Sequence, residues 1–134
     1  MKRYHYPIVV TPKDIDFNGH VNNVTYLAWM IEAATEHSKS VGFPYQECLK
    51  LGGTWVAKSH TIEYKKPSFN ADELLMETWI ESIGKILSIR RYKLTRPSDG
   101  VLILEGKTEW VFVDAKKMRP MKIPVEIVKG FETE

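Results

Sequence analysis

Residues 14–37 read DIDFNGHVNNVTYLAWMIEAATEH and divide into a polar part and an apolar part. The first ten residues are rich in carboxylate, amide and imidazole side chains, whereas the next dozen are almost entirely apolar. Asn22 or Asn23 has the short oxygen-bearing side chain that caps the start of a helix. The pattern therefore predicts a helix from Val24 to about Lys39, with the polar loop at its positively polarised N-terminus.

The predicted helix is apolar on nearly all of its surface. Its one consistently polar stripe consists of Thr25, Glu32, Glu36 and Lys39. A helix of this kind has to be buried by elements that surround it. Because the rest of the chain has the alternating pattern of strands, we expect a sheet to wrap around this helix.

Turn signals separate the predicted strands. Gly84-Lys85 and Asp99-Gly100 suit tight turns, and such short connections join antiparallel neighbours. The sequence thus predicts a single α+β domain over residues 1–134, a long central helix wrapped by a curled antiparallel sheet of about five strands. The expected strands span residues 4–11, 55–65, 74–83, 86–95 and 101–113, and short helical segments are expected at 45–51 and 125–131.

Composition narrows the class of protein. With 43% hydrophobic and 27% charged residues, the chain has the balance of an ordinary globular protein. The net charge of +2 mildly favours an anionic ligand, and the basic cluster at 116–122 lacks the interleaved aromatics of a nucleic-acid site. A single cysteine, Cys48, suits a reducing compartment, so we expect a cytoplasmic protein. Neither a signal-peptide core nor a membrane span is expected.

The stretch from Asp16 to Tyr26 resembles the loop of the hotdog-fold acyl thioesterases. The 4-hydroxybenzoyl-CoA thioesterase-like family has an Asp, a Gly and a Tyr at the places held here by Asp16, Gly19 and Tyr26. The pattern Asp-x-Asn-x-His-Val-Asn-Asn-x-x-Tyr is closer still to the acyl-ACP thioesterases of plants and bacteria. Bacterial long-chain acyl-CoA thioesterases share its His-Val-Asn-Asn core. The plant enzymes usually have Gln where Gly19 stands, and their hotdog unit is doubled.

The resemblance implies a cofactor-free hydrolase that converts acyl-CoA, or acyl-ACP, to free acid and thiol. Asp16 would be the general base or the nucleophile, since a carboxylate can take either role. By position in the aromatic-CoA branch, the backbone N–H of Asn23 would bind the oxyanion. Asn18 and His20 would orient water or polarise the carbonyl. Further candidates for substrate contact are Gly19, Tyr26, His60 and Lys85.

Structural roles compete with these assignments. Asn22 suits a helix cap, Asp14 suits a solvated position, and Gly19 suits a turn. Metal binding by the acidic residues and His20 is disfavoured because no second His follows at i+4, so no metal is predicted. A nucleophilic pair of Cys48 with a His is weaker still, because the Cys lies on a predicted amphipathic helix.

Other roles and assemblies stay open from the sequence. Trp29, Trp55 and Trp79 with Met30 could line an acyl tunnel, although such residues more often form a core. A non-catalytic acyl-CoA-binding module and a hotdog dehydratase are the alternative functions. One curled sheet on one helix leaves an open edge and a groove, and pairing two such units would cover both. Hotdog proteins, by resemblance, are dimers or tetramers, so a homodimer or homotetramer is expected.

Overall fold

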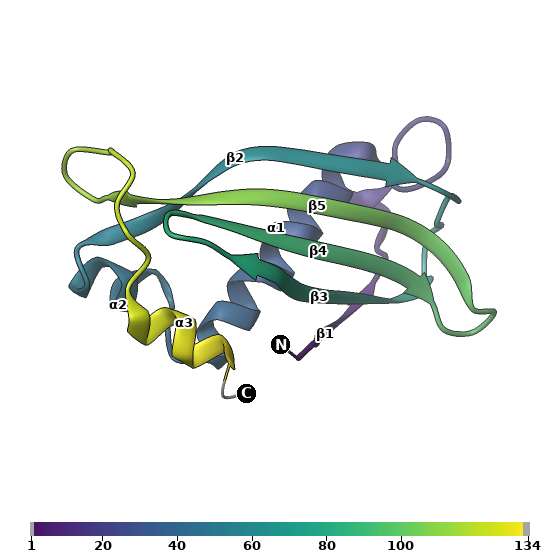
Figure 1. Ribbon diagram of the computed structural model, residues 1–134. Coiled ribbons are helices and arrows are strands. Elements are labelled where there is room, and N and C mark those ends of the chain that lie inside the picture. The colour runs from purple at the N-terminus through teal and green to yellow at the C-terminus, as the bar shows by residue number, and fades with distance from the viewer. Residues whose placement is uncertain (1, 133–134) are drawn as a thin grey trace.

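A computed structural model describes residues 2–132 (Figure 1). A five-stranded antiparallel sheet, ordered β1-β3-β4-β5-β2, curves over the long helix α1. This arrangement confirms the predicted α+β class. The elements are β1 Tyr4–Val9, the 3-10 helix η1 Pro12–Asp14, α1 Asn23–Ser40, α2 Tyr45–Lys50, β2 Gly53–Tyr64, β3 Glu73–Ile83, β4 Leu87–Arg96, β5 Val101–Asp114 and α3 Val125–Glu132.

Most of the predicted boundaries agree with the structure. Each predicted strand end lies within two residues of the observed one. The β3–β4 and β4–β5 connections are tight turns, as the Gly84 and Asp99-Gly100 signals predict. The C-terminal segment, predicted as one or two helical turns, is the eight-residue helix α3.

The strict alternation of side chains that the sequence predicts for β2 is interrupted. Strict alternation places Val56 on the same side as Ile62 and Tyr64, but the pairing with β5 shifts between Ala57 and Ser59. This β-bulge inserts one extra residue and reverses which side chains face inward. As a result Val56 is exposed, and Trp55 packs against the ring of Phe112 instead.

The sheet wraps α1 as predicted, but it does not bury the helix on all sides. Tyr26, Met30 and Ala33 are buried against the sheet, whereas Val24 is 74% exposed and Ile31 is 37% exposed. A single curved sheet covers one side of a helix and leaves the other open. The buried side of α1 lies very close to β5 at Gly106. A Cβ added to this glycine would lie only 2.8 Å from Met30 Cε.

A second apolar cluster closes the end of the sheet where α2 and α3 lie (Figure 1). Cys48 of α2 and Ile127 and Phe131 of α3 pack around Phe112 and Ile80. This cluster lies beside the C-terminal half of α1, while the polar loop is at the opposite end of that helix. The two ends of α1 therefore have different surroundings.

The first residue of β2 is expected to tolerate no side chain. An added Cβ at Gly53 would lie 2.7 Å from Phe112 Cζ and 2.8 Å from the backbone oxygen of Val113. A backbone oxygen in a paired strand cannot move aside, so Gly53→Ala should lower the free energy of unfolding by about 3 kcal/mol, as for severe overpacking. Urea unfolding would measure this change.

Gly84→Ala is the matched control. Its added Cβ would be 3.4 Å from the nearest atom, the Leu87 oxygen, and this glycine does not have a positive φ. Its free energy of unfolding should change by no more than about 0.5 kcal/mol. Equal stability of the two variants would contradict the packing argument at Gly53.

Candidate active site

Residues 15–21 form a closed loop before α1. Ile15 and Val21 make an isolated antiparallel bridge, and the Asp16 N–H donates to the His20 oxygen at 3.0 Å. Gly19 N–H donates back to the Asp16 oxygen, also at 3.0 Å. Gly19 has a φ of +83°, a conformation that glycine adopts without strain. These bonds hold Asp16 and His20 opposite each other, where the two ends of the loop pair.

The Asp16 carboxylate is half-buried and partly engaged. Its Oδ1 accepts the Asn18 N–H at 2.8 Å, which fixes the side chain in a local turn. Its second oxygen accepts no hydrogen bond from any residue in 2–132. This oxygen can therefore accept a hydrogen bond from a water molecule, or it can attack a carbonyl carbon. Asn18 itself is exposed, and Phe17 at the loop tip is 98% exposed.

The start of α1 leaves one backbone donor available. Asn22 is the N-cap, and its Oδ1 accepts the Val24 N–H at 2.9 Å. Asp14 has a structural role, because its carboxylate accepts the N–H and the hydroxyl of Thr11. The N–H of Asn23 has no acceptor among the described residues. It lies at the first helical position, where the helix dipole favours negative charge.

A cavity of about 210 Å³ opens beside this helix start. His20, Asn23 and Tyr26 form one wall, and the end of β2 with residues 65–67 forms the other. The His20 ring is held loosely, since its Nδ1 is 3.4 Å from the Val21 oxygen. Asp16 and Asn18 belong to the adjoining loop and do not line the cavity itself.

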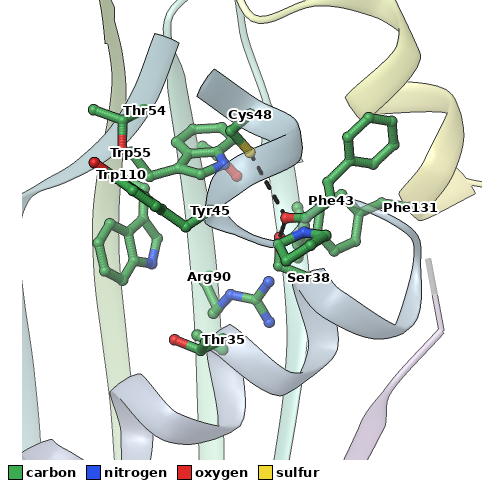
Figure 2. A pocket seen from close by; sticks show the side chains of 14 residues that line it. Thr35, Ser38, Phe43, Tyr45, Cys48, Thr54, Trp55, Arg90, Trp110 and Phe131 are labelled. Atoms are coloured by element: carbon green, nitrogen blue, oxygen red, sulfur yellow. Dashed lines mark hydrogen bonds between the residues drawn. The ribbon is translucent and has the colours of Figure 1, made fainter. Parts of the chain in front are cut away.

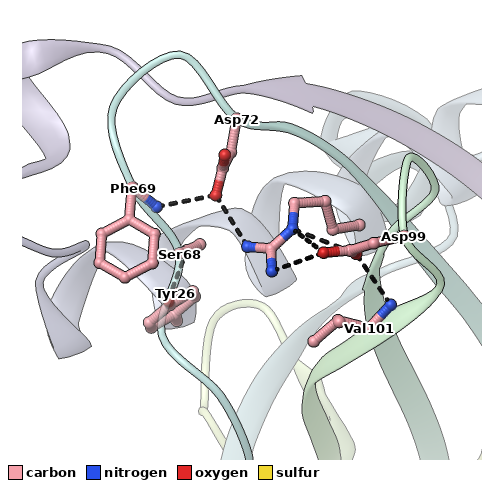
Figure 3. A network of polar contacts seen from close by, with 7 residues as sticks. Tyr26, Ser68, Phe69, Asp72, Asp99 and Val101 are labelled. Carbon is pink, nitrogen blue, oxygen red and sulfur yellow. Dashed lines mark hydrogen bonds and ion pairs between the residues drawn. The ribbon is translucent and has the colours of Figure 1, made fainter.

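Long-range contacts hold the two walls together. The Tyr26 hydroxyl lies 2.6 Å from the buried Ser68 hydroxyl (Figure 3). Tyr64 donates to the Asn23 oxygen at 3.4 Å. Burial raises the pKa of Tyr26. Arg96 binds both Asp72 and Asp99 beside this contact, which ties the β2–β3 connection to the β4–β5 turn.

His60 lies on β2 but away from the loop. Its Nδ1 is 2.8 Å from the Thr108 hydroxyl, which accepts the Tyr92 O–H at 3.0 Å. The Thr108 hydroxyl can therefore donate its own hydrogen bond to Nδ1. In that arrangement the neutral imidazole carries its proton on Nε2. Desolvation lowers the pKa of His60, so the neutral form is favoured. His60 and Tyr64 are four positions apart, which corresponds to about 13 Å along the strand.

Lys85 is farther still from the loop. It lies at the β3–β4 turn, at the end of the sheet that carries α3, where its oxygen accepts the Ile123 N–H. Within one chain, the structure therefore brings Asp16, Asn18, Gly19, His20, Asn23 and Tyr26 to one end of α1 and places His60 and Lys85 elsewhere.

Two lysines that the sequence analysis did not single out lie at the cavity, whereas Lys85 does not. Lys65 and Lys66 line the cavity beside Asn23. No local pattern identifies them, because the end of β2 reaches the helix start only through its pairing with β5. The same holds for Ser68, which is 42 positions from its partner Tyr26.

A second cavity, of about 200 Å³, lies beside the C-terminal half of α1 (Figure 2). We call it the aromatic cavity, because aromatic side chains such as Trp55, Trp110 and Phe131 line it together with residues of α1, α2, β3 and β4. The guanidinium of Arg90 points into it, and the residue as a whole is 4% exposed. Arg90 contacts His37 Nδ1 at 2.9 Å and the Thr78 hydroxyl at 3.0 Å.

The tryptophans predicted as tunnel or core residues divide between roles. Trp55 lines the aromatic cavity. Trp29 packs edge-on against Tyr26 in the core. Trp79 lies under the Arg3 guanidinium, which is 3.9 Å from its ring centroid.

The remaining chemistry of the described residues is limited. Residues 2–132 contain no group of three or more His, Cys, Asp or Glu side chains placed to hold a metal ion. Cys48 is buried, and burial raises its pKa to about 11, which keeps the thiol protonated at neutral pH. No helix in this range is long and apolar enough to span a membrane.

Comparisons with known proteins fit this arrangement. Residues 2–131 match the family model of the acyl-ACP thioesterase N-terminal domain. The acyl-CoA thioester hydrolase YbgC of Escherichia coli O157:H7 is 27% identical over 129 residues, which cover 96% of each chain. A chloroplastic palmitoyl-acyl carrier protein thioesterase of Arabidopsis thaliana is 32% identical over 108 residues, 75% of this chain and 23% of the plant protein.

A solved structure supports the fold. Slr0204, a 1,4-dihydroxy-2-naphthoyl-CoA thioesterase from Synechocystis, superposes with a TM-score of 0.89 at 18% identity, over 97% of this chain and 96% of that one. The predicted hotdog fold is confirmed by this match.

Proposed function

Because the chain belongs to the family of acyl-ACP thioesterase N-terminal domains, we propose that it hydrolyses acyl thioesters of coenzyme A or acyl-carrier protein. One observation carries the proposal. The loop that holds Asp16 and His20 closes directly before a helix whose first N–H, that of Asn23, has no acceptor among the described residues. A carboxylate and an oxyanion donor thus come from one short segment. The names of the bacterial and plant relatives support coenzyme A and carrier protein as thiol carriers.

In the proposed reaction, Asp16 takes a proton from a water molecule as the water oxygen attacks the thioester carbonyl carbon. The oxyanion that forms accepts the Asn23 N–H. Collapse of this intermediate breaks the C–S bond and releases the thiolate, whose low basicity makes it a good leaving group. In the nucleophilic variant, Asp16 attacks directly, releases the thiolate and leaves an acyl anhydride that water then hydrolyses.

His20, Asn18, Gly19 and Tyr26 have supporting roles in this proposal. His20 lines the cavity and is only loosely held, so its ring can orient the attacking water. Asn18 at the exposed turn can hydrogen-bond the substrate. Gly19 lets the loop turn, and Tyr26 forms the cavity wall while its hydroxyl is engaged by Ser68.

The acyl group would extend along α1 toward the aromatic cavity. Asn23, Leu27, Ile31 and Thr35 are spaced at i+4 and so share one stripe of the helix. The stripe begins at the active-site cavity and ends at the aromatic one, a distance of about 18 Å along the helix axis. Leu27 and Ile31 between them are apolar and partly exposed, which suits contact with a hydrocarbon chain.

A second copy of the chain would complete the assembly. β2 pairs with β5 on one side, and its other edge has no partner strand in the described part of the chain. Pairing two such edges would cover both, together with the exposed apolar residues of α1. We propose a homodimer, or a tetramer of two such dimers, in which His60 and Lys85 contact substrate held by the other copy. The free, buried Cys48 supports a cytoplasmic location.

Thiol release from a panel of acyl-CoA and acyl-ACP substrates tests the proposal, and light scattering tests the assembly. The expected result is multiple turnover with at least one thioester. Thermal stabilisation by acyl-CoA without thiol release would favour a binding module instead. Hydration of an enoyl-CoA without thiol release would favour a dehydratase.

A further inference from the structure

The cavity at the start of α1 has one positively charged wall. Lys65 and Lys66 line it opposite His20 and Asn23, and none of the described residues that line it is acidic. The aromatic cavity at the far end of the helix stripe is largely apolar. Arg90, which points into that cavity, is hydrogen-bonded to His37 and Thr78, whereas two lysines line the cavity at the helix start.

The backbone brings both lysines to the same cavity. Successive side chains of a strand point to opposite faces, but β2 ends at Tyr64. The N–H groups of Lys65 and Lys66 then both donate to the Ile103 oxygen, at 2.8 Å and 3.2 Å. Two residues later, buried Ser68 is held by Tyr26 and accepts the Val21 N–H. The segment is thus fixed on both sides of the lysine pair.

The two lysines differ in how far their charge is already balanced. Lys65 Nζ is 2.7 Å from the Glu63 carboxylate, and this contact lowers the pKa of Glu63 and raises the pKa of Lys65. Lys66 forms no ion pair with any residue in 2–132. Lys66 therefore offers the less compensated charge.

We propose that Lys66, assisted by Lys65, binds a phosphate of the pantetheine arm, so that the thiol half of the substrate leaves across the end of β2 while the acyl half lies along α1. This inference rests on the proposed function. Lysine is a common phosphate ligand that acts as a point charge. Coenzyme A and the prosthetic group of acyl-carrier protein both have such a phosphate, so the inference concerns their shared chemistry.

Steady-state kinetics with three thioesters of one acyl group test the proposal. Lys66→Glu should raise KM for the acyl-CoA about fivefold at low salt with kcat unchanged, as expected for contact with a non-reacting part of the substrate. The acyl-N-acetylcysteamine thioester, which has no phosphate, should be unaffected. An equal rise for acyl-CoA and acyl-ACP points to the shared phosphate, and a rise for acyl-CoA alone points to the nucleotide phosphates.

Glu63→Gln gives a change of opposite sign. It removes the carboxylate that balances Lys65, so KM for the acyl-CoA should fall about twofold. Lys107→Glu is the control for net charge, because Lys107 lies on the outer face of β5, opposite the inward-facing Gly106 and Thr108. It should leave KM unchanged.

Binding of free coenzyme A, measured by calorimetry, separates this inference from the proposed function. Lys66→Glu should weaken that binding whether or not the wild-type protein turns over a thioester. Unchanged KM and unchanged coenzyme A affinity in Lys66→Glu would overturn the phosphate assignment. So would an equal KM increase for the phosphate-free thioester, or an equal effect of Lys107→Glu.

Discussion

Replacing Asp16 by Asn is expected to lower kcat for thioester hydrolysis by about a thousandfold, because the amide can neither accept a proton from water nor attack a carbonyl carbon. The fold should be retained. The Asn oxygen can still accept the Asn18 N–H that fixes Asp16 in its turn. Thiol release gives the rate, and circular dichroism with thermal unfolding checks the fold.

Asp14→Asn is the matched control for this experiment. Asp14 lies two positions away, but its carboxylate is bound to the N–H and the hydroxyl of Thr11. Losing its charge should reduce stability by up to about 1 kcal/mol and leave kcat nearly unchanged. If Asp16→Asn kept the wild-type kcat, or if both variants lost activity equally, Asp16 would not have the proposed role.

Asn23→Pro is expected to lower kcat by about 100- to 1,000-fold, the usual effect of losing one oxyanion donor. The substitution removes the backbone N–H and the side-chain amide but should leave the helix intact, because proline is well accepted at the first position of a helix. The preceding residue is also compatible. Asn22 has φ −66° and ψ 138°, the extended conformation that a following proline requires.

Asn23→Ala separates the backbone from the side chain. It keeps the N–H and removes the amide group, so kcat should stay within a few-fold of the wild type. Thermal unfolding should show both variants folded. Loss of activity in Asn23→Ala equal to that in Asn23→Pro would assign the function to the side chain, and wild-type activity in Asn23→Pro would exclude this N–H as the oxyanion donor.

Local sequence patterns predicted the elements and the loop because their causes are local. The Asn22 cap and the Gly84 turn depend on residues a few positions apart, and both are found as predicted. The bulge after Ala57 could not be predicted, because an extra residue in one strand is defined only by the register of its partner. The open side of α1 was missed for a related reason, since apolar composition does not reveal how far a sheet reaches around a helix.

The candidate site was predicted only in its contiguous part. Residues 16–26 were identified because they form one motif in the sequence. Lys66 was missed, and Lys85 lies at the other end of the sheet, because their positions depend on strand pairing. The charge count favours an anionic ligand, but it cannot say which lysine faces the site.

The contacts that join Tyr26 and Val21 to Ser68 also bear on how the protein opens. They link the helix start to the β2–β3 connection, more than forty residues away. The complete site therefore exists only when α1 and this connection are both folded and in contact. The Val21 amide, bonded to the Ser68 oxygen at 3.0 Å, should consequently exchange with deuterium only in the rarest, global openings, while the Asn18 amide at the exposed turn exchanges quickly. Activity would then be lost only when the whole domain unfolds.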